Sequence, residues 1–385
     1  MSAQDKIRVG VIGAGQLARM MVPPAIALGI DISVLAEAPE MSAKRAADRV
    51  GDYKDAETVL EFAKTVDVIT FDHEHVPQSV LRALTDAGHS VQPPAEALRY
   101  AQNKILMRQK LTELGVPVPS WRAVKTAPEL QDFIYEHGGR AVVKTATGGY
   151  DGKGVRVVTS GDEAADWFAQ LGDTEALLAE ELVDFTRELS QLVARNPSGQ
   201  QATWPVVETE QRDGVCAVVT APAPSGSAAG AAALNEAAAN IGTQVAAGVG
   251  VTGVLAVEMF ETRDGRLLVN ELAMRPHNSG HFSIEGSITS QFEQHLRAVT
   301  DLPLGDTAMR EPHAVMVNVL GGPPEGAMPV RYAEIMAKYP TVKIHSYGKS
   351  PRPGRKVGHV TVTGHNLQAV KQQAIDCAAE FGEGA

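Results

Sequence analysis

The chain has few aromatic residues and few cysteines, and it contains no long hydrophobic run. Aromatic side chains make up only 5% of its 385 residues, so the cores must be built mainly from Val, Leu, Ile and Ala. The two cysteines, Cys216 and Cys377, have neither a zinc-binding nor a redox spacing, which argues against a disulfide framework and favours a reducing cytoplasm. No window reaches the roughly 18 apolar residues of a membrane helix, and no secretory signal opens the chain. We therefore expect a cytoplasmic protein without membrane contact.

An excess of basic residues is also missing. The 35 Lys and Arg residues are outnumbered by 46 Asp and Glu residues, which gives a net charge of -11. Proteins that bind nucleic acids usually carry a basic surface, so nucleic acid is not an expected partner, although a local basic pocket is compatible with this balance. Hydrophobic residues are 44% and charged residues 21%, a composition that argues against disordered, coiled-coil and fibrous chains.

The length and the order of the predicted elements divide the chain into three domains. Strands at 7–12, 32–35 and 66–71 alternate with helical stretches, so residues 1–100 predict a small Rossmann-like domain with a parallel sheet. In residues 101–300 we expect helices and strands mixed, with strands at 141–145, 155–158, 176–180, 189–194, 254–260 and 267–270. One helix is expected over 95–114 and another near 231–248. Residues 301–385 predict a small β-rich domain, with strands at 314–320, 342–345 and 357–362 and a closing helix near 366–380.

Gly13 and Gly15 follow the first predicted strand and precede a helix. A Gly-x-Gly turn in this place allows a phosphate to approach closely, and the free N–H groups of the helix N-terminus favour an anion. Ala18 replaces the third glycine of the dinucleotide fingerprint, and Glu37 is a loosely placed ribose acceptor. Three interpretations therefore stay open: NAD binding, binding of another phosphate, and a merely structural turn.

A second glycine-rich segment carries a stronger signal. Lys144 lies on a predicted buried strand, and glycines occupy positions 148, 149, 152 and 154 before the next strand. The backbone N–H groups of such a flap can fold over anionic oxygens, and Lys144 would face a nucleotide phosphate. This is not a Walker loop, because no Gly-Lys-Ser/Thr opens a helix. The alternative is a glycine-rich hairpin with a solvated lysine.

Two acidic segments follow. Glu180 and Glu181 end a predicted strand before Leu182 and Val183, an arrangement that suits an adenine edge and ribose hydroxyls, with a solvated acidic turn as the alternative. Further on, the turn at 262–265 joins two strands that carry Glu258 and Glu271.

The two acids of this second segment predict a cation site. Period-2 alternation can make Glu258 and Glu271 cross-strand neighbours. Facing carboxylates repel each other unless a cation separates them, and Mg²⁺ prefers such hard oxygen ligands. We expect Mg²⁺, or alternatively Mn²⁺, at Glu258 and Glu271. Asn270 could add an oxygen ligand, although strand alternation would usually point it away. Two exposed acids are the simpler alternative.

The lysine strand, the glycine flap, the Glu-Glu pair and the acidic hairpin occur in this order. Together they resemble the ATP-grasp superfamily, in which two α+β lobes close on ATP. The resemblance implies a flexible lid over about 118–185, and it places Lys104 where the superfamily often has Arg. It implies the following ATP-binding residues: Lys104, Lys144, Gly148, Gly149, Tyr150, Asp151, Gly152, Lys153, Gly154, Glu180, Glu181, Leu182, Val183, Glu188, Gln211, Asn270 and Glu271.

Three further motifs narrow the resemblance. The stretches 13–17, 275–281 and 352–359 are similar to those of the N5-carboxyaminoimidazole ribonucleotide synthetases, and the similarity extends to about residue 365. That family implies ATP- and bicarbonate-dependent carboxylation of 5-aminoimidazole ribonucleotide through carboxyphosphate, in purine biosynthesis, by a homodimer. Two alternatives stay open: an ATP-grasp ligase like the formate-dependent glycinamide ribonucleotide transformylase, and an NAD-dependent dehydrogenase.

The substrates of such an enzyme are anions, which basic side chains would hold. The predicted substrate-binding residues are Gln16, Tyr150, Arg275, His277, Asn278, Ser279, Lys349, Arg352, Arg355 and Lys356. Asp151, Lys356 and Arg275 are the expected catalytic residues, for positioning or proton transfer. Closure of the flap would exclude water from the labile intermediate.

Some residues depart from this interpretation or compete with it. Gln211 stands near the nucleotide, where the family commonly has a histidine, although its amide can still form a hydrogen bond. His277 and His281 are four residues apart but lack the His-Glu-x-x-His pattern, so zinc is not expected. The run Asp-His-Glu-His at 72–75 is either a set of metal ligands or, as we prefer, a strand end at the cleft.

Overall fold

The N-terminal part of the chain forms an open parallel sheet. We describe the chain from a computed structural model, which covers residues 6–148, 154–172, 174–212 and 214–382. The strands are β1 (Arg8–Ile12), β2 (Asp31–Ala36), β3 (Ala47–Val50), β4 (Val68–Phe71) and β5 (Ser90–Val91). The helices are α1 (Gln16–Leu28), α2 (Ala56–Ala63) and α3 (Gln78–Asp86). The order β3-β2-β1-β4-β5, with every pair parallel, confirms the predicted Rossmann-like arrangement.

Two helices lead out of this sheet where the sequence predicts one. They are α4 (Ala95–Gln102) and α5 (Lys104–Glu113). The expectation of a single helix is wrong because Asn103 adopts an extended backbone, with φ -135° and ψ 111°. Its side-chain oxygen accepts hydrogen bonds from the backbone N–H groups of Ile105 and Leu106, both at 3.0 Å. Asn103 therefore acts as an N-cap that starts a new helix at Lys104.

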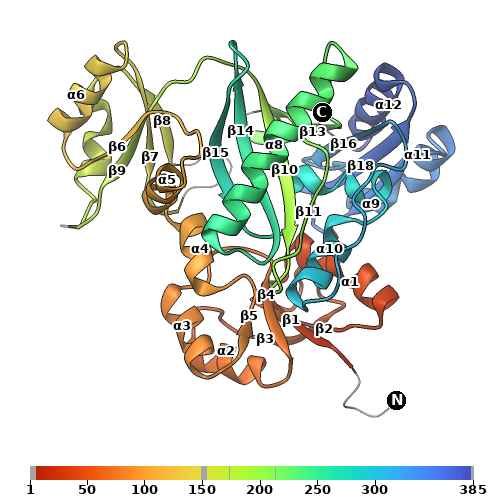
Figure 1. Cartoon of the computed structure of the whole chain (residues 1–385). Coiled ribbons are helices and arrows are strands. Elements are labelled where there is room, and N and C mark those ends of the chain that lie inside the picture. Colours follow the sequence, from red (N-terminus) through yellow and green to blue (C-terminus); the bar gives the residue numbers. More distant parts are fainter. Residues whose placement is uncertain (1–5, 149–153, 173, 213, 383–385) are drawn as a thin grey trace.

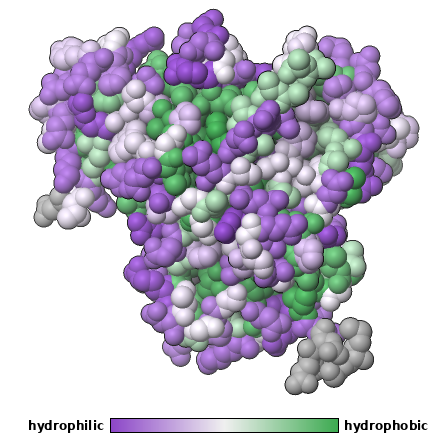
Figure 2. Space-filling model, viewed as in Figure 1, coloured by the Kyte–Doolittle hydropathy of each residue, from purple (hydrophilic) through white to green (hydrophobic). Residues whose placement is uncertain are grey.

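A small four-stranded sheet forms a separate lobe, which we call the lid (Figure 1). Its strands are β6 (Trp121–Val124), β7 (Ala141–Thr145), β8 (Val155–Val158) and β9 (Leu177–Glu181), in the order β6-β9-β7-β8. The helices are α6 (Ala127–Glu136), the short 3-10 turn η2 (Gly161–Ala164) and α7 (Ala165–Phe168). The lid has its own apolar cluster, which includes Phe133 and Val143. In the view of Figure 2 its outer surface is mostly polar.

A nine-stranded sheet forms the body of the molecule (Figure 1). The path is β15-β14-β10-β12-β13-β16-β18-β17, and β11 pairs with β10 at the side. The strands before residue 300 are β10 (Phe185–Arg195), β11 (Gln201–Thr203), β12 (Val207–Arg212), β13 (Val215–Ala221), β14 (Gly253–Thr262) and β15 (Leu267–Ala273). The other elements there are α8 (Ala228–Val249), the 3-10 turn η3 (Asn278–Gly280), α9 (Ser283–Gly286) and α10 (Gln291–Val299).

The C-terminal strands extend this same sheet. They are β16 (His313–Leu320), β17 (Lys343–Ser346) and β18 (Lys356–Gly364), accompanied by η4 (Met328–Arg331), α11 (Tyr332–Lys338) and α12 (Leu367–Ala379). The predicted strands and the closing helix are present, but β16 pairs with β13, so the C-terminal strands do not form a sheet of their own. A core cluster likewise runs from Phe71 of the N-terminal sheet to Val245 of α8 and Val257 of β14. The parts are therefore packed together in one body.

The helices give no sign of a membrane-spanning segment. Across the described residues, none is both long and apolar enough to pass through a bilayer.

Candidate active site

The acidic hairpin is formed by β14 and β15. In the register of these antiparallel strands, Glu258 lies opposite Glu271, as predicted. The register then shifts, because Met259 pairs with Val269 and leaves Asn270 as an extra residue. A β-bulge of this kind re-aims side chains, and the Asn270 side chain faces the lid instead of pointing away. The bulge thus corrects the strand alternation that the sequence suggested.

Lys144 of the lid meets this bulge. Its Nζ atom donates to Asn270 Oδ1 at 2.9 Å and lies 2.8 Å from Glu180 Oε2. The Lys144 side chain is 8% exposed and that of Glu180 is 3% exposed. Burial tends to raise the pKa of Glu180, but the charges of Arg108 and Lys144 outweigh it and lower the pKa. Glu180 is therefore a buried carboxylate held between two cations.

Lys104 connects α5, the flap and the acidic hairpin. It is the first residue of α5, and its backbone N–H donates to the carbonyl oxygen of Ala146 at 2.8 Å. Its Nζ atom donates to Gly148 O at 3.2 Å and lies 3.7 Å from Glu271 Oε1. Gly148 and Gly154 flank the flap with φ values of +69° and +75°, which glycine adopts without strain. The other predicted flap residues, Gly149, Tyr150, Asp151, Gly152 and Lys153, lie outside the described residues.

The end of β9 and the residues directly after it carry the predicted adenine contacts. The two adjacent acids differ, because Glu180 turns inward whereas Glu181 is half-buried and accepts a bond from Ser120 N at 2.9 Å. Leu182 is 38% exposed, as expected of an apolar residue that borders a cleft. Gln211 is exposed at the end of β12.

A network of polar side chains surrounds Glu258. Its Oε1 atom lies 3.1 Å from His277 Nε2, and His277 Nδ1 lies 2.8 Å from Ser279 Oγ. Ser279 Oγ in turn lies 2.8 Å from the hydroxyl of Ser190, the β10 residue opposite Glu258. The side-chain amide of Gln291 makes two hydrogen bonds with the backbone of His277. Its oxygen accepts from His277 N and its nitrogen donates to His277 O, at 2.8 Å each. Sequence analysis missed Ser190 and Gln291, because both act through residues far away in the chain.

The pKa values of the acids in this region diverge. Burial and the charge of Glu258 raise the pKa of Glu188 to about 7. Burial acts in the same direction on Glu258, but the bond to His277 and the charges of His277, Arg275 and Lys356 outweigh it and lower the pKa of Glu258. The opposite directions of these pKa shifts reflect interactions between the acids of the predicted cation site and the basic residues of the predicted substrate site.

Glu74 positions Arg275 from the N-terminal sheet. Its Oε2 atom lies 3.2 Å from Arg275 Nε, and its Oε1 atom accepts from Met274 N at 2.5 Å. Glu74 follows the end of β4 at residue 71, the type of place where parallel sheets line a cleft. Of the two interpretations of residues 72–75, the position of Glu74 after β4 favours a strand end at the cleft. Within the described residues, no group of three or more His, Cys, Asp or Glu side chains is arranged to hold a metal by itself.

The first glycine turn is occupied by carboxylates of the chain itself. Asp72 accepts from Gly15 N at 3.0 Å and from Ala18 N at 2.7 Å. Glu37 accepts from Ala14 N at 3.3 Å and lies 3.2 Å from His73 Nε2. Because Asp72 takes N–H groups that a pyrophosphate would need, this geometry disfavours a dinucleotide at the turn.

The basic C-terminal loop reaches the N-terminal sheet beside this turn. Lys349 Nζ donates to Gln16 Oε1 at 2.6 Å, across 333 positions of sequence. Gly354 has φ +68°, and Arg355 N donates to Arg352 O at 2.9 Å, which confirms the predicted turn. Arg352 itself is exposed. The loop thus places Lys349 against Gln16.

Lys356 and Asn278 are predicted substrate-binding residues that lie near the acidic hairpin. Lys356 begins β18 and its charge acts on Glu258. Both Lys356 and Asn278 act on the buried thiol of Cys216, although burial dominates there and raises the pKa of Cys216 to about 12. The structure therefore brings Arg275, His277, Asn278, Ser279 and Lys356 together beside the acidic hairpin.

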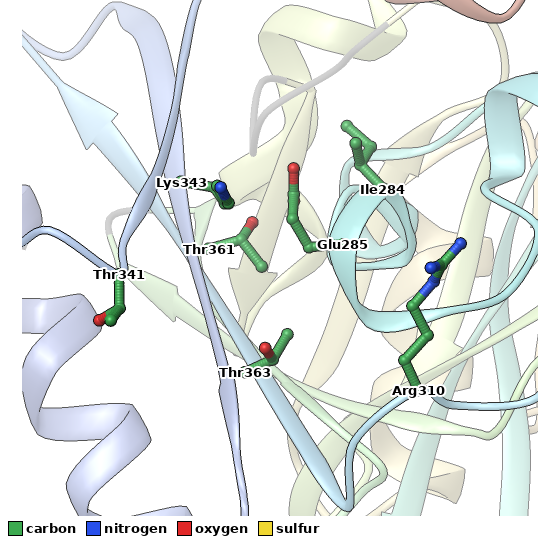
Figure 3. A pocket seen from close by; sticks show the side chains of 7 residues that line it. All are labelled: Ile284, Glu285, Arg310, Thr341, Lys343, Thr361 and Thr363. Atoms are coloured by element: carbon green, nitrogen blue, oxygen red, sulfur yellow. The ribbon is translucent and has the colours of Figure 1, made fainter.

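A separate polar cavity of about 320 Å³ lies between α9 and the strands β17 and β18 (Figure 3). The residues that line it are Ile284, Glu285, Arg310, Thr341, Lys343, Thr361 and Thr363. Figure 3 shows Lys343, Glu285 and Thr361 pointing toward one another there. None of the predicted site residues lines this cavity, so it is not part of the site described above.

The described acids form a donor set that suits a divalent cation bound together with a ligand. Glu258 and Glu271 are cross-strand neighbours, and Glu188 lies near enough to Glu258 for its own pKa to rise. One or two carboxylates are what Mg²⁺ uses when phosphate oxygens and water supply the remaining ligands. His277 and Lys104 lie beside these acids, with His277 Nε2 3.1 Å from Glu258 and Lys104 Nζ 3.7 Å from Glu271.

Known protein families match the chain in three parts. Three family models match consecutive parts of the chain: the ribonucleotide synthetase preATP-grasp domain at residues 6–102, the ATP-grasp domain at 109–292, and the phosphoribosylaminoimidazole carboxylase C-terminal domain at 314–373. They confirm the predicted fold class, an ATP-grasp fold with an N-terminal Rossmann-like domain and a small C-terminal domain.

Relatives match along nearly the whole chain. The N5-carboxyaminoimidazole ribonucleotide synthase of Mycobacterium tuberculosis is 48% identical over 371 residues, which are 95% of this chain and 86% of the relative. The enzyme of the same name from Corynebacterium ammoniagenes is 46% identical over 383 residues, which are 97% and 91% of the two chains.

Solved structures agree as well. The synthetase from Thermus thermophilus is 35% identical, with 98% and 99% of the two chains covered and a TM-score of 0.86. The synthase from Aspergillus clavatus, solved with ADP and 5-aminoimidazole ribonucleotide, is 33% identical, with 98% and 100% covered and a TM-score of 0.86. On this evidence, the chain belongs to the N5-carboxyaminoimidazole ribonucleotide synthase family of ATP-grasp ligases.

Proposed function

We propose that this chain catalyses the ATP- and bicarbonate-dependent carboxylation of 5-aminoimidazole ribonucleotide to N5-carboxyaminoimidazole ribonucleotide, in purine biosynthesis. The observation that carries the proposal is the meeting of two sites at the cross-strand pair Glu258 and Glu271. On one side lie Lys144 and the base of the glycine flap, with Lys104 bonded to Gly148 O and 3.7 Å from Glu271. On the other side His277 touches Glu258 directly, at 3.1 Å. A nucleotide phosphate and a second anionic substrate would therefore meet at this pair of acids.

The nucleotide half would be formed by the lid and the acidic hairpin. Lys144 and Lys104 would contact phosphate oxygens, the flap would cover them, and Leu182 and Val183 would border the adenine. Glu188, whose pKa is raised to about 7, lies next to Glu258 on the same face and would take part in ribose or cation binding. The complexes of relatives with ATP and with ADP are consistent with these assignments.

Mg²⁺ would be held by Glu258 and Glu271. Its chemistry is to neutralise charge on the phosphate oxygens and to fix their positions. The chain's own residues border this place, because His277 lies against Glu258 and Lys104 lies against Glu271. Mn²⁺ has a similar preference for oxygen ligands.

The second half would bind the aminoimidazole nucleotide and bicarbonate. A bicarbonate oxygen attacks the γ-phosphorus of ATP, and ADP leaves with the electron pair of the broken P–O bond. Carboxyphosphate then splits into carbon dioxide and phosphate. The exocyclic amine attacks the carbon dioxide and gives up one proton, which leaves the carbamate. Arg275 and Lys356 would hold the anions, while Gln16 and Lys349 would bind the 5′-phosphate. Asp151 would position the amine or accept its proton.

The test is the release of ADP by the purified chain with 5-aminoimidazole ribonucleotide and Mg²⁺. We expect release to require both the nucleotide and bicarbonate. Release that formate supports and bicarbonate does not would overturn the proposal and favour a transformylase-like ligase. Binding of NADH in the absence of any ATP binding would favour a dehydrogenase.

The compartment and assembly belong to the same proposal. Both cysteines are free thiols, which suits a reducing cytoplasm. The family resemblance suggests a homodimer, and we expect light scattering of the purified chain to give a mass of twice 40.8 kDa. The mass of a single chain would contradict the dimer without affecting the proposed reaction.

A further inference from the structure

A fully buried arginine lies behind the predicted ATP site. Arg108 is on α5 and is 0% exposed. Its Nε atom donates to Glu180 Oε1, and its Nη2 atom donates to the carbonyl oxygen of Asn270 at 2.8 Å. Burial of an arginine is rare unless it is paired, and sequence analysis did not identify this residue.

Arg108 closes a ring of four residues. Glu180 joins Arg108 to Lys144, Lys144 joins Glu180 to the Asn270 side chain at 2.9 Å, and the Asn270 carbonyl returns to Arg108. The ring connects four elements: α5, the lid strands β7 and β9, and β15 at its bulge. Asn270 precedes Glu271 directly, so the ring also fixes the acidic hairpin relative to the lid.

The charges in this ring do not cancel. Two cations, Arg108 and Lys144, share the single carboxylate of Glu180, which leaves one positive charge in excess. If Arg108 were neutral, Glu180 and Lys144 would form a closed buried pair, whose attraction is strong because water does not screen it. Lys144 would then offer little net charge to a phosphate.

We propose that Arg108 is a positioning residue that neutralises Glu180 and thereby leaves the charge of Lys144 available to the phosphates of ATP. The inference rests on the proposed function, since it takes Lys144 as a phosphate ligand. It assigns no substrate contact to Arg108 itself. Its consequence is that nucleotide affinity follows the net charge of Arg108, Glu180 and Lys144 together, not the identity of the residue at 108.

The experiment measures the dissociation constant of Mg·ADP by calorimetry for four variants, with thermal unfolding as a check on folding. Arg108→Gln removes the excess charge, and we expect the affinity to fall about tenfold. Arg108→Lys keeps the charge, and Arg108→Gln combined with Glu180→Gln restores it, so both should bind within about threefold of the parent chain. Arg122→Gln is the matched control, because Arg122 pairs with Glu136 at 2.7 Å on the lid surface and its loss should leave affinity unchanged.

Other outcomes contradict the inference in distinguishable ways. A role in stability alone predicts that the double variant binds no better than Arg108→Gln, and that result would overturn the proposal. If Arg108→Gln does not fold, Arg108→Lys and the double variant provide the test. The proposal is overturned if either of them folds but binds ADP about tenfold more weakly than the parent chain. Lys144→Met tests the proposed ATP site separately from the role of Arg108. Normal ADP binding by that variant would overturn the ATP site itself.

Discussion

Lys144 Nζ donates to Asn270 Oδ1 at 2.9 Å, a bond that joins the middle of the lid to the bulge in the acidic hairpin. The two residues are 126 positions apart, and neither strand alone would place them in contact. The bond exists because the bulge turns Asn270 toward the lid. It ties the lid to the residue directly before Glu271.

Lys144→Met removes the cation that we assign to the nucleotide phosphates. We expect kcat/KM for ATP to fall about a hundredfold, as is usual when a charged group that stabilises a reacting phosphate is lost. Measurement of bicarbonate-dependent ADP release over a range of ATP concentrations checks this. Lys125→Met, at an exposed position after β6, is the control and should leave the rate unchanged. Equal activity of both variants would contradict the assignment.

Asn270→Ala removes the amide oxygen that aims Lys144 but keeps both cations and Glu180. We expect a rise of about tenfold in KM for ATP with a smaller change in kcat, because Lys144 would still be present but less well oriented. Steady-state kinetics at saturating aminoimidazole nucleotide give both values. Asn240→Ala, at an exposed position on α8, should match the parent chain. A fall in kcat with an unchanged KM would show that Asn270 acts in the chemical step.

Glu188 makes the stability of the chain depend on pH. Burial and the charge of Glu258 raise its pKa from an ordinary 4.5 to about 7 in the folded chain. The folded state therefore binds this proton more tightly than the unfolded state does. The stability from this group is complete below pH 4.5 and is lost progressively as pH rises through about 7.

Glu188→Gln should abolish that loss. We expect its Tm at pH 8, without nucleotide, to exceed that of the parent chain by about 2 °C or more, and the difference to shrink toward pH 5. Differential scanning calorimetry at both pH values measures it. Glu236→Gln, at an exposed position on α8, provides the comparison. A difference in Tm that stays constant with pH would mean that titration of Glu188 is not its cause.

Glu74→Gln weakens the contacts of Glu74 with Arg275 and Met274. Because these contacts orient the substrate half of the proposed site, we expect KM for 5-aminoimidazole ribonucleotide to rise about tenfold while KM for ATP changes by less than about twofold. Both constants come from the same ADP-release assay. An equal rise in both constants would indicate that Glu74 maintains the whole cleft instead.

Gln16 and Lys349 should act as one unit toward the substrate phosphate. Each single change, Gln16→Ala or Lys349→Met, is expected to raise KM for the aminoimidazole nucleotide, and the double variant should be little worse than either, since bonded neighbours are not additive. A double-mutant cycle on kcat/KM measures this coupling. Fully additive effects would show that the two side chains bind the substrate independently.

Much of the site could be predicted because its parts are local. The lysine strand, the glycine flap and the acidic hairpin each occupy a short stretch, and period-2 alternation was enough to pair Glu258 with Glu271. The turn at Gly354 followed from glycine's tolerance of a left-handed backbone. The break at Asn103 was missed, because helical periodicity does not reveal when a side chain will cap a new helix.

Local sequence patterns specify the fold class, the order of the motifs and the residue types that we propose to face a nucleotide. The packing of distant elements specifies which charged groups have which partner: Arg108 pairs with Glu180, Arg275 with Glu74, and Lys349 with Gln16. The physical reason is that local patterns fix which face of an element a side chain occupies, whereas the partner depends on how distant elements pack. In a chain with a net charge of -11, that packing leaves a positive excess at Lys144.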